Sequence, residues 1–102
     1  MLKEPLTFKL DDDVCNTLHF LFYMVDSYGE ILKDLLSNKR CINANKELLD
    51  YYNEQYIEYS IKFKTLQDEV LYSIYDLPEK TKAVFHLDFM KQELIITDLI
   101  QV

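Results

Sequence analysis

Cys15 and His19 are the first residues whose types and spacing could support chemistry. They lie four positions apart, a spacing that can bind zinc on one side of a helix. A tetrahedral zinc site needs two further ligands, and the remaining Cys41 and His86 lie far along the chain. A Cys–His nucleophile pair would also need an oxyanion site, and a chain with one glycine has no glycine-rich loop to form it. We therefore expect no metal, no cofactor and no enzymatic activity.

Carboxylates occur in two arrangements that could bind a cation or exchange protons. Asp11, Asp12 and Asp13 are consecutive, but the glycine and the spaced oxygen ligands of a calcium loop do not follow them. We interpret this run as the N-terminal cap of a helix. Glu54 and Glu58 lie one helical turn apart, and acid–base work would require a cleft that separates their pKa values. We expect both to lie on a solvated helix face.

Charge and composition limit the kinds of partner. The chain of 102 residues has a net charge of −7, from 18 acidic and 11 basic residues. An acidic surface repels phosphate backbones, so we expect no direct binding of nucleic acid. The apolar run 20–25 is far too short to cross a membrane, and the N-terminus lacks the apolar run of a signal peptide. Two widely spaced cysteines do not form a disulfide framework, so the sequence predicts a cytoplasmic protein with reduced thiols.

Apolar periodicity predicts two long helices, 12–36 and 44–76, that pack as an antiparallel hairpin. The first seam consists of Val14, Leu18, Leu21, Val25, Tyr28, Leu32 and Leu35. The second seam consists of Leu48, Tyr52, Tyr56, Tyr59, Phe63, Leu66, Val70 and Ile74. Asn43 or Asn45 can cap the second helix. Gly29 inside the first helix costs about 1 kcal/mol relative to alanine and marks either a close contact or a mild bend.

Strands are predicted at both ends of the chain. Residues 6–10 alternate between apolar and polar side chains, which is typical of a half-buried strand. Residues 83–89 also alternate, and residues 94–100 are rich in β-branched side chains. We interpret them as a β-hairpin with a turn at 90–93, which the N-terminal strand can join. The predicted fold class is α+β, mainly helical, in a single domain of 102 residues; the alternative is an all-α bundle with a third, C-terminal helix.

Apolar residues outside the two seams predict a surface for another protein. The first helix carries Phe20, Met24 and Ile31 beside its seam, so its apolar arc, on the order of 200°, is wider than one partner helix covers. The second helix carries Ile57 and Ile61 toward the side opposite its seam. We expect these five residues to form a protein interface, for example in a homodimer of two coiled-coil-like hairpins.

The sequence therefore predicts a small acidic interaction or assembly module that self-associates through its helical hairpin and has no small-molecule substrate. Frequent Lys, Ile, Asn and Tyr, with a single Arg and no Trp, indicate an AT-rich genome, such as that of a low-GC bacterium or its phage. The alternative is an acidic inhibitor or regulator that binds a host nucleic-acid-binding protein. That function would use exposed carboxylates such as Asp26, Glu30, Asp34, Glu54 and Glu58.

Overall fold

The computed structural model describes residues 3–37 and 46–102. The elements follow in the order β1 (Leu6–Lys9), α1 (Asp12–Ser37), α3 (Lys46–Ile74), β2 (Thr81–Asp88) and β3 (Glu93–Gln101). They confirm an α+β fold that is mainly helical, with strands at both ends of the chain. The chain forms two compact units. The hairpin unit is Leu18–Leu66, and the sheet unit is Met1–Thr17 together with Gln67–Val102.

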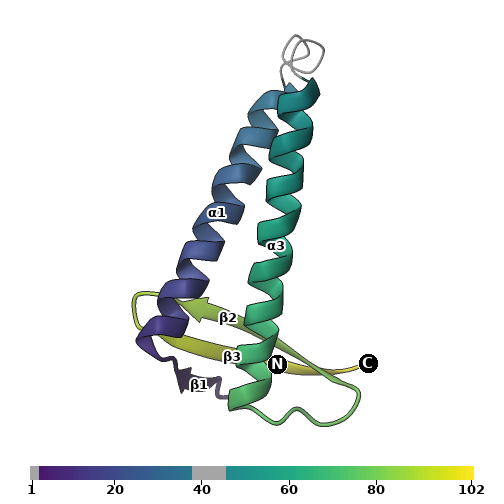
Figure 1. The fold of residues 1–102 in the computed structure, drawn as a ribbon. Coiled ribbons are helices and arrows are strands. Elements are labelled where there is room, and N and C mark those ends of the chain that lie inside the picture. Colours follow the sequence, from purple (N-terminus) through teal and green to yellow (C-terminus); the bar gives the residue numbers. More distant parts are fainter. Residues whose placement is uncertain (1–2, 38–45) are drawn as a thin grey trace. The chain divides into compact units, whose positions relative to one another are not determined.

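In the hairpin unit, α1 and α3 run side by side in opposite directions (Figure 1). Phe22 contacts Phe63, with ring centroids 5.9 Å apart. Further along α1, Tyr28 stacks on Tyr59, with centroids 5.7 Å apart. Residue numbers therefore rise along α1 as they fall along α3, which confirms the predicted antiparallel hairpin.

Gly29 lies where the two helices approach each other closely. A Cβ atom at this position would lie 3.3 Å from Cε2 of Tyr56, which is closer than an ordinary carbon–carbon contact of about 3.5–4.0 Å. The missing side chain therefore makes room for the tyrosine ring. Of the two explanations that the sequence allowed for this glycine, the structure supports the close contact.

The α1 seam is confirmed by Leu18, Leu21 and Leu32, which are all buried. The α3 seam was wrong at its first residue, because Leu48 is 42% exposed. In the antiparallel register Leu48 lies level with Ser37, the last described residue of α1. Helix α3 spans Lys46–Ile74, so it ends two residues before the predicted end at 76. The predicted start at 44 and the expected capping residues Asn43 and Asn45 lie outside the described residues.

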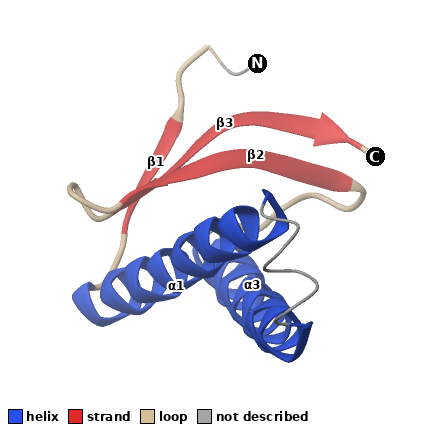
Figure 2. Cartoon of the chain, turned by 90° about the horizontal axis from the view of Figure 1, so that it is seen from above, coloured by secondary structure: helices blue, strands red, loops and turns tan. Residues whose placement is uncertain are grey.

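The sheet unit contains an antiparallel sheet with the strand order β1-β3-β2 (red in Figure 2). The N-terminal strand joins the C-terminal hairpin as predicted, by pairing with β3. On one face, Leu94 lies between Phe8 and Leu87, and Ile96 lies next to it on the same strand. Leu94 and Ile96 are both fully buried, whereas Ile95, on the opposite face of the same central strand, is half-buried.

The turn between β2 and β3 comprises residues 89–92, one residue earlier than predicted. Pairing of Asp88 with Glu93 closes the hairpin, and the Asp88 carboxylate accepts a hydrogen bond of 3.0 Å from the Lys91 backbone N–H. Gln92 takes the left-handed backbone conformation, with φ of 56°, that such a turn requires. The length of four residues was correct, and the shift arises because β2 ends at Asp88 rather than at 89 and β3 begins at Glu93 rather than at 94.

A β-bulge interrupts β3 at Thr97. Val84 pairs with Asp98 and the next residue, Phe85, pairs with Ile96, so Thr97 is an extra residue in β3. A bulge changes which side chains face each side of the sheet. It returns Leu99, the partner of Ala83, to the buried face.

Candidate interaction surfaces

Cys15 is a structural thiol in the sheet unit. Its side chain is 3% exposed, and its Sγ donates a hydrogen bond of 3.7 Å to the carbonyl oxygen of Phe89. Burial, followed by the negative charge of Asp12, raises the pKa of this thiol above its ordinary value. Because the thiolate is the nucleophile and the metal ligand, this environment disfavours both kinds of reactivity.

Neither histidine joins Cys15 in a ligand cluster. His19 and His86 are both exposed, and Cys41 lies outside the described residues. Among the residues that the structure describes, no group of three or more His, Cys, Asp and Glu side chains is placed to hold a metal ion. Within the same residues, neither helix has an apolar stretch of the length that a membrane crossing requires.

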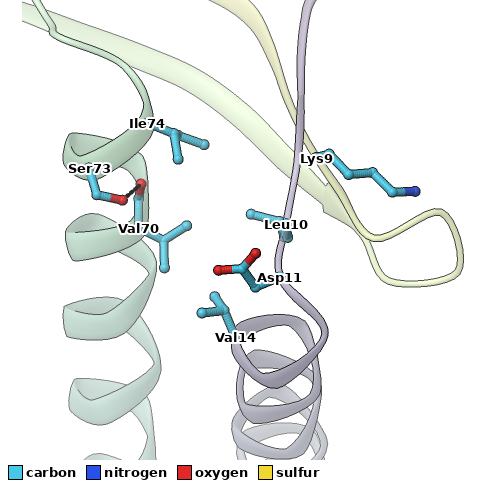
Figure 3. Close-up of a pocket in the computed structure, with 7 residues that line it drawn as sticks. All are labelled: Lys9, Leu10, Asp11, Val14, Val70, Ser73 and Ile74. Carbon is cyan, nitrogen blue, oxygen red and sulfur yellow. Dashed lines mark hydrogen bonds between the residues drawn. The ribbon is translucent and has the colours of Figure 1, made fainter.

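A cavity of about 190 Å³ lies in the sheet unit, beside the junction of β1 and α1 and the last turns of α3 (Figure 3). Its lining residues are Lys9, Leu10, Asp11, Val14, Val70, Ser73 and Ile74.

The polar groups of this cavity are mostly engaged elsewhere. The Ser73 hydroxyl donates a hydrogen bond of 2.8 Å to the carbonyl oxygen of Val70 in its own helix. The Lys9 side chain points away from the cavity (Figure 3) and donates to the carbonyl oxygen of Lys91. The carboxylate of Asp11 points toward α3 (Figure 3), but the Ser73 hydroxyl and the Lys9 ammonium are engaged in the hydrogen bonds above, and no histidine or cysteine lines the cavity. We therefore assign no catalytic role to this cavity.

The predicted interface residues of α1 lie on the surface of the hairpin unit. Phe20 is 54% exposed and Ile31 is 36% exposed, and Met24 is half-buried. At 100° per residue they lie about 120° around α1 from the buried seam. Helix α3 therefore does not cover them, and they form a stripe along one flank of α1, in which Ser27 lies between Met24 and Ile31.

The predicted interface residues of α3 point in a different direction. Ile57 is 48% exposed and Ile61 is 61% exposed. They lie about 160° around α3 from the side that carries Tyr52, Tyr59 and Phe63, whose rings contact α1. The structure thus leaves both predicted patches exposed but does not bring them together on one face.

Tyr51 is a surface residue that sequence reasoning did not select. It is 50% exposed, its ring contacts the Tyr52 ring with centroids 5.3 Å apart, and its side chain is a neighbour of the Tyr28 hydroxyl. Desolvation, followed by the neighbouring Tyr51 and Tyr59, raises the pKa of Tyr28. Tyr51 lies about 100° around α3 from the seam. This angle follows from the sequence and could have identified Tyr51 as a residue at the flank of the hairpin.

The flank that carries the α1 stripe therefore has both an apolar and an aromatic part. Tyr28 lies on the same side of the α1 seam as Phe20 and Ile31, and it links this stripe to Tyr51 on α3. Lys62 borders the same flank, where its ammonium lies 5.2 Å from the centroid of the Tyr59 ring. Such a mixture of aromatic and apolar residues with a charged rim is typical of protein–protein interfaces.

The five carboxylates of the alternative hypothesis are all exposed, namely Asp26, Glu30, Asp34, Glu54 and Glu58. Glu58 forms a salt bridge of 3.0 Å with Lys62 one turn later. Exposed pairs of this kind contribute little to stability, so the carboxylate remains available to a basic partner.

In comparisons with known proteins, no protein-family model, no curated protein and no solved structure matches this chain.

Proposed function

We propose that this protein is a small acidic interaction module that assembles through its hairpin unit, with a second copy of the chain as the partner. The observation that supports the proposal is the exposure of large apolar side chains on both helices, 54% for Phe20 and 61% for Ile61. A helix that packs against one neighbour needs one apolar stripe, and each of these helices has additional apolar residues. The composition and the two widely spaced cysteines support a cytoplasmic protein of a low-GC bacterium or its phage.

The energetics favour an association that depends on concentration. Complete burial of a large apolar side chain stabilises by about 1.5–3 kcal/mol. Phe20, Ile57 and Ile61 are each about half-exposed, so each would contribute roughly half of that. Because association also costs translational and rotational freedom, we expect a reversible complex whose population rises with protein concentration.

The test is the solution mass of the full chain, measured by size-exclusion chromatography with light scattering over a wide concentration range. We expect a mass above the monomer's 12.2 kDa that falls on dilution. Met24→Glu and Ile61→Glu place a charge in the α1 stripe and in the α3 patch, respectively. Lys33→Glu, at an exposed position on the other side of α1, is the matched control and should retain the parent's mass. A wild-type chain that stays monomeric at every concentration would overturn self-association.

The exposure of the five carboxylates supports a second candidate, an acidic inhibitor or regulator of a host nucleic-acid-binding protein. Binding of this kind is dominated by charge and weakens as salt screens it. An immobilised basic nucleic-acid-binding protein should then retain the chain at low salt and release it at high salt. Association through apolar stripes should change little over the same range, which separates the two candidates.

A further inference from the structure

The α1 stripe has a spacing that suits helix pairing. Phe20, Met24, Ser27 and Ile31 follow one another at steps of four, three and four residues, which is the spacing of a heptad seam. We infer that this stripe pairs with the same stripe of a second copy in an antiparallel arrangement, with the two-fold axis between Val25 and Asp26. This inference rests on the proposed self-association and specifies its face, direction and register.

Side-chain sizes along the stripe are complementary in this register. A two-fold axis between Val25 and Asp26 places Phe20 opposite Ile31 of the second copy, and Met24 opposite Ser27 of the second copy. Each long or bulky side chain therefore meets a smaller one, and the two-fold axis repeats both contacts. An interface related by a two-fold axis must be self-complementary in this way.

The charges beside the stripe are compatible with the antiparallel direction. Glu30 and Asp34 border its C-terminal half, whereas Asn16 and Tyr23 border its N-terminal half on the same side. Antiparallel pairing places Glu30 and Asp34 of each helix opposite the uncharged Asn16 and Tyr23 of the other. Parallel pairing about a two-fold axis would instead place Phe20 against Phe20 and Met24 against Met24, so the complementarity of side-chain size would be lost. The antiparallel alignment also sets the two helix dipoles in opposite directions.

The α3 patch does not suit the same partner. Ile57 and Ile61 are two residues only, and charged side chains surround them on the helix surface, namely Asp50, Lys64 and Asp68. This patch and the α1 stripe point about 140° apart around the hairpin, so one flat surface cannot cover both. The longer stripe, with its aromatic flank at Tyr28 and Tyr51, is the better dimer face.

Cysteine cross-linking of the full chain tests direction and register together. Phe20→Cys and Ile31→Cys are made in a background with Cys15→Ala and Cys41→Ser, and each variant is oxidised alone and in an equal mixture. In the antiparallel register, position 20 of one copy meets position 31 of the other copy. The two copies of position 20 lie about 16 Å apart along the helix axis, and so do the two copies of position 31. The mixed dimer keeps one native Phe20–Ile31 contact, so it can still form.

The expected result is several-fold more cross-linked dimer in the mixture than with either variant alone. Met24→Glu should raise the dissociation constant at least about tenfold, whereas Ile61→Glu should leave it unchanged. Helical circular dichroism confirms that each variant is folded.

The other outcomes separate the two proposals. Efficient cross-linking by either variant alone would mean parallel pairing, which overturns the register and leaves self-association intact. A dimer by light scattering that shows no cross-linking in any sample, or that Ile61→Glu dissociates, would place the interface on another face. A monomer at every concentration would overturn the register and the proposed self-association together.

Discussion

Substitution of Gly29 by alanine is expected to change the stability of the chain very little, because two effects oppose each other. In the interior of a helix, alanine is favoured over glycine by about 1 kcal/mol. The added Cβ would lie 3.3 Å from Cε2 of Tyr56, so the ring must move by a few tenths of an ångström. Overpacking of a tight core costs roughly 1–3 kcal/mol, and the half-buried Tyr56 ring can yield at the lower end of that range. The net change should lie within about 0.5 kcal/mol of zero.

A double-mutant cycle isolates the contact from the helix propensity. Tyr56→Leu removes the ring atom that the new Cβ would meet, while it keeps an apolar side chain in the seam. In that background Gly29→Ala should stabilise by the full propensity term of about 1 kcal/mol. Urea unfolding followed by circular dichroism at 222 nm gives the four free energies, and their coupling should be roughly 0.5–1.5 kcal/mol.

The reasoning is refuted if Gly29→Ala changes the free energy of unfolding equally in both backgrounds. Equal changes would mean that the Tyr56 ring does not pack on Gly29, and the close approach of α1 and α3 at that level would be wrong. Linear plots with equal m-values in all four proteins are the control for a common unfolding reaction.

Four further substitutions test other parts of the structure by chemical unfolding. Leu18→Ala should destabilise by about 3 kcal/mol, because Leu18 is fully buried and truncation leaves a cavity; a change below about 1 kcal/mol would show that the site is not packed. Ser60→Ala should stabilise by about 1 kcal/mol, since the buried Ser60 hydroxyl has no hydrogen-bond partner among the described residues and its removal relieves that cost. Gln92→Gly should stabilise by up to about 1 kcal/mol by relieving the left-handed backbone at φ of 56°, whereas Lys91→Gly next to it should not. Because the folded-state pKa of Cys15 is raised above its ordinary 9.0, the stability that this thiol contributes is complete below pH 9.0 and is lost as the pH rises above it; Cys15→Ala should flatten that part of the curve.

The two helices could be predicted from the sequence because their burial follows one simple period. Side chains at steps of three and four residues share a face of any helix, so Leu18, Leu21 and Leu32 could be identified without knowing what covers them. The exposure of Leu48 could not be predicted in the same way. It depends on the antiparallel register between α1 and α3, and this register is a property of the pair of helices.

The interaction surface could be predicted in part for the same reason. The phase of Phe20, Met24 and Ile31 relative to the seam predicted that one partner helix would leave them uncovered, and Phe20 and Ile31 are exposed. The contribution of Tyr51 could not be predicted, because its proximity to Tyr28 depends on the register between the two helices. The angular position of a residue around its own helix therefore identifies exposed apolar residues. Only the packed pair of helices shows which residues of the other helix border them.

The C-terminal sheet shows where periodicity fails. Alternation predicted both strands of the hairpin, but the bulge at Thr97 changes the phase of β3 part-way along the strand. Thr97 is a common strand residue, and no glycine marks the position. The bulge can be detected only from the pairing of β2 with β3. Ala83 and Phe85 need partners on one face of the sheet, and Leu99 reaches that face only because β3 contains one extra residue.

The separation of the two apolar patches also constrains the kind of assembly that the chain can form. Pairing through the α1 stripe about a two-fold axis uses that face completely and closes a dimer. Ile57 and Ile61 would then remain exposed on each copy, 48% and 61% as in the single chain. If each of these patches also paired with itself, every copy would have two different two-fold contacts, and such contacts build an open chain of copies unless their axes meet. A mass that levels off at twice 12.2 kDa would therefore show that one face carries the association, whereas a mass that keeps rising with concentration would show that both faces do.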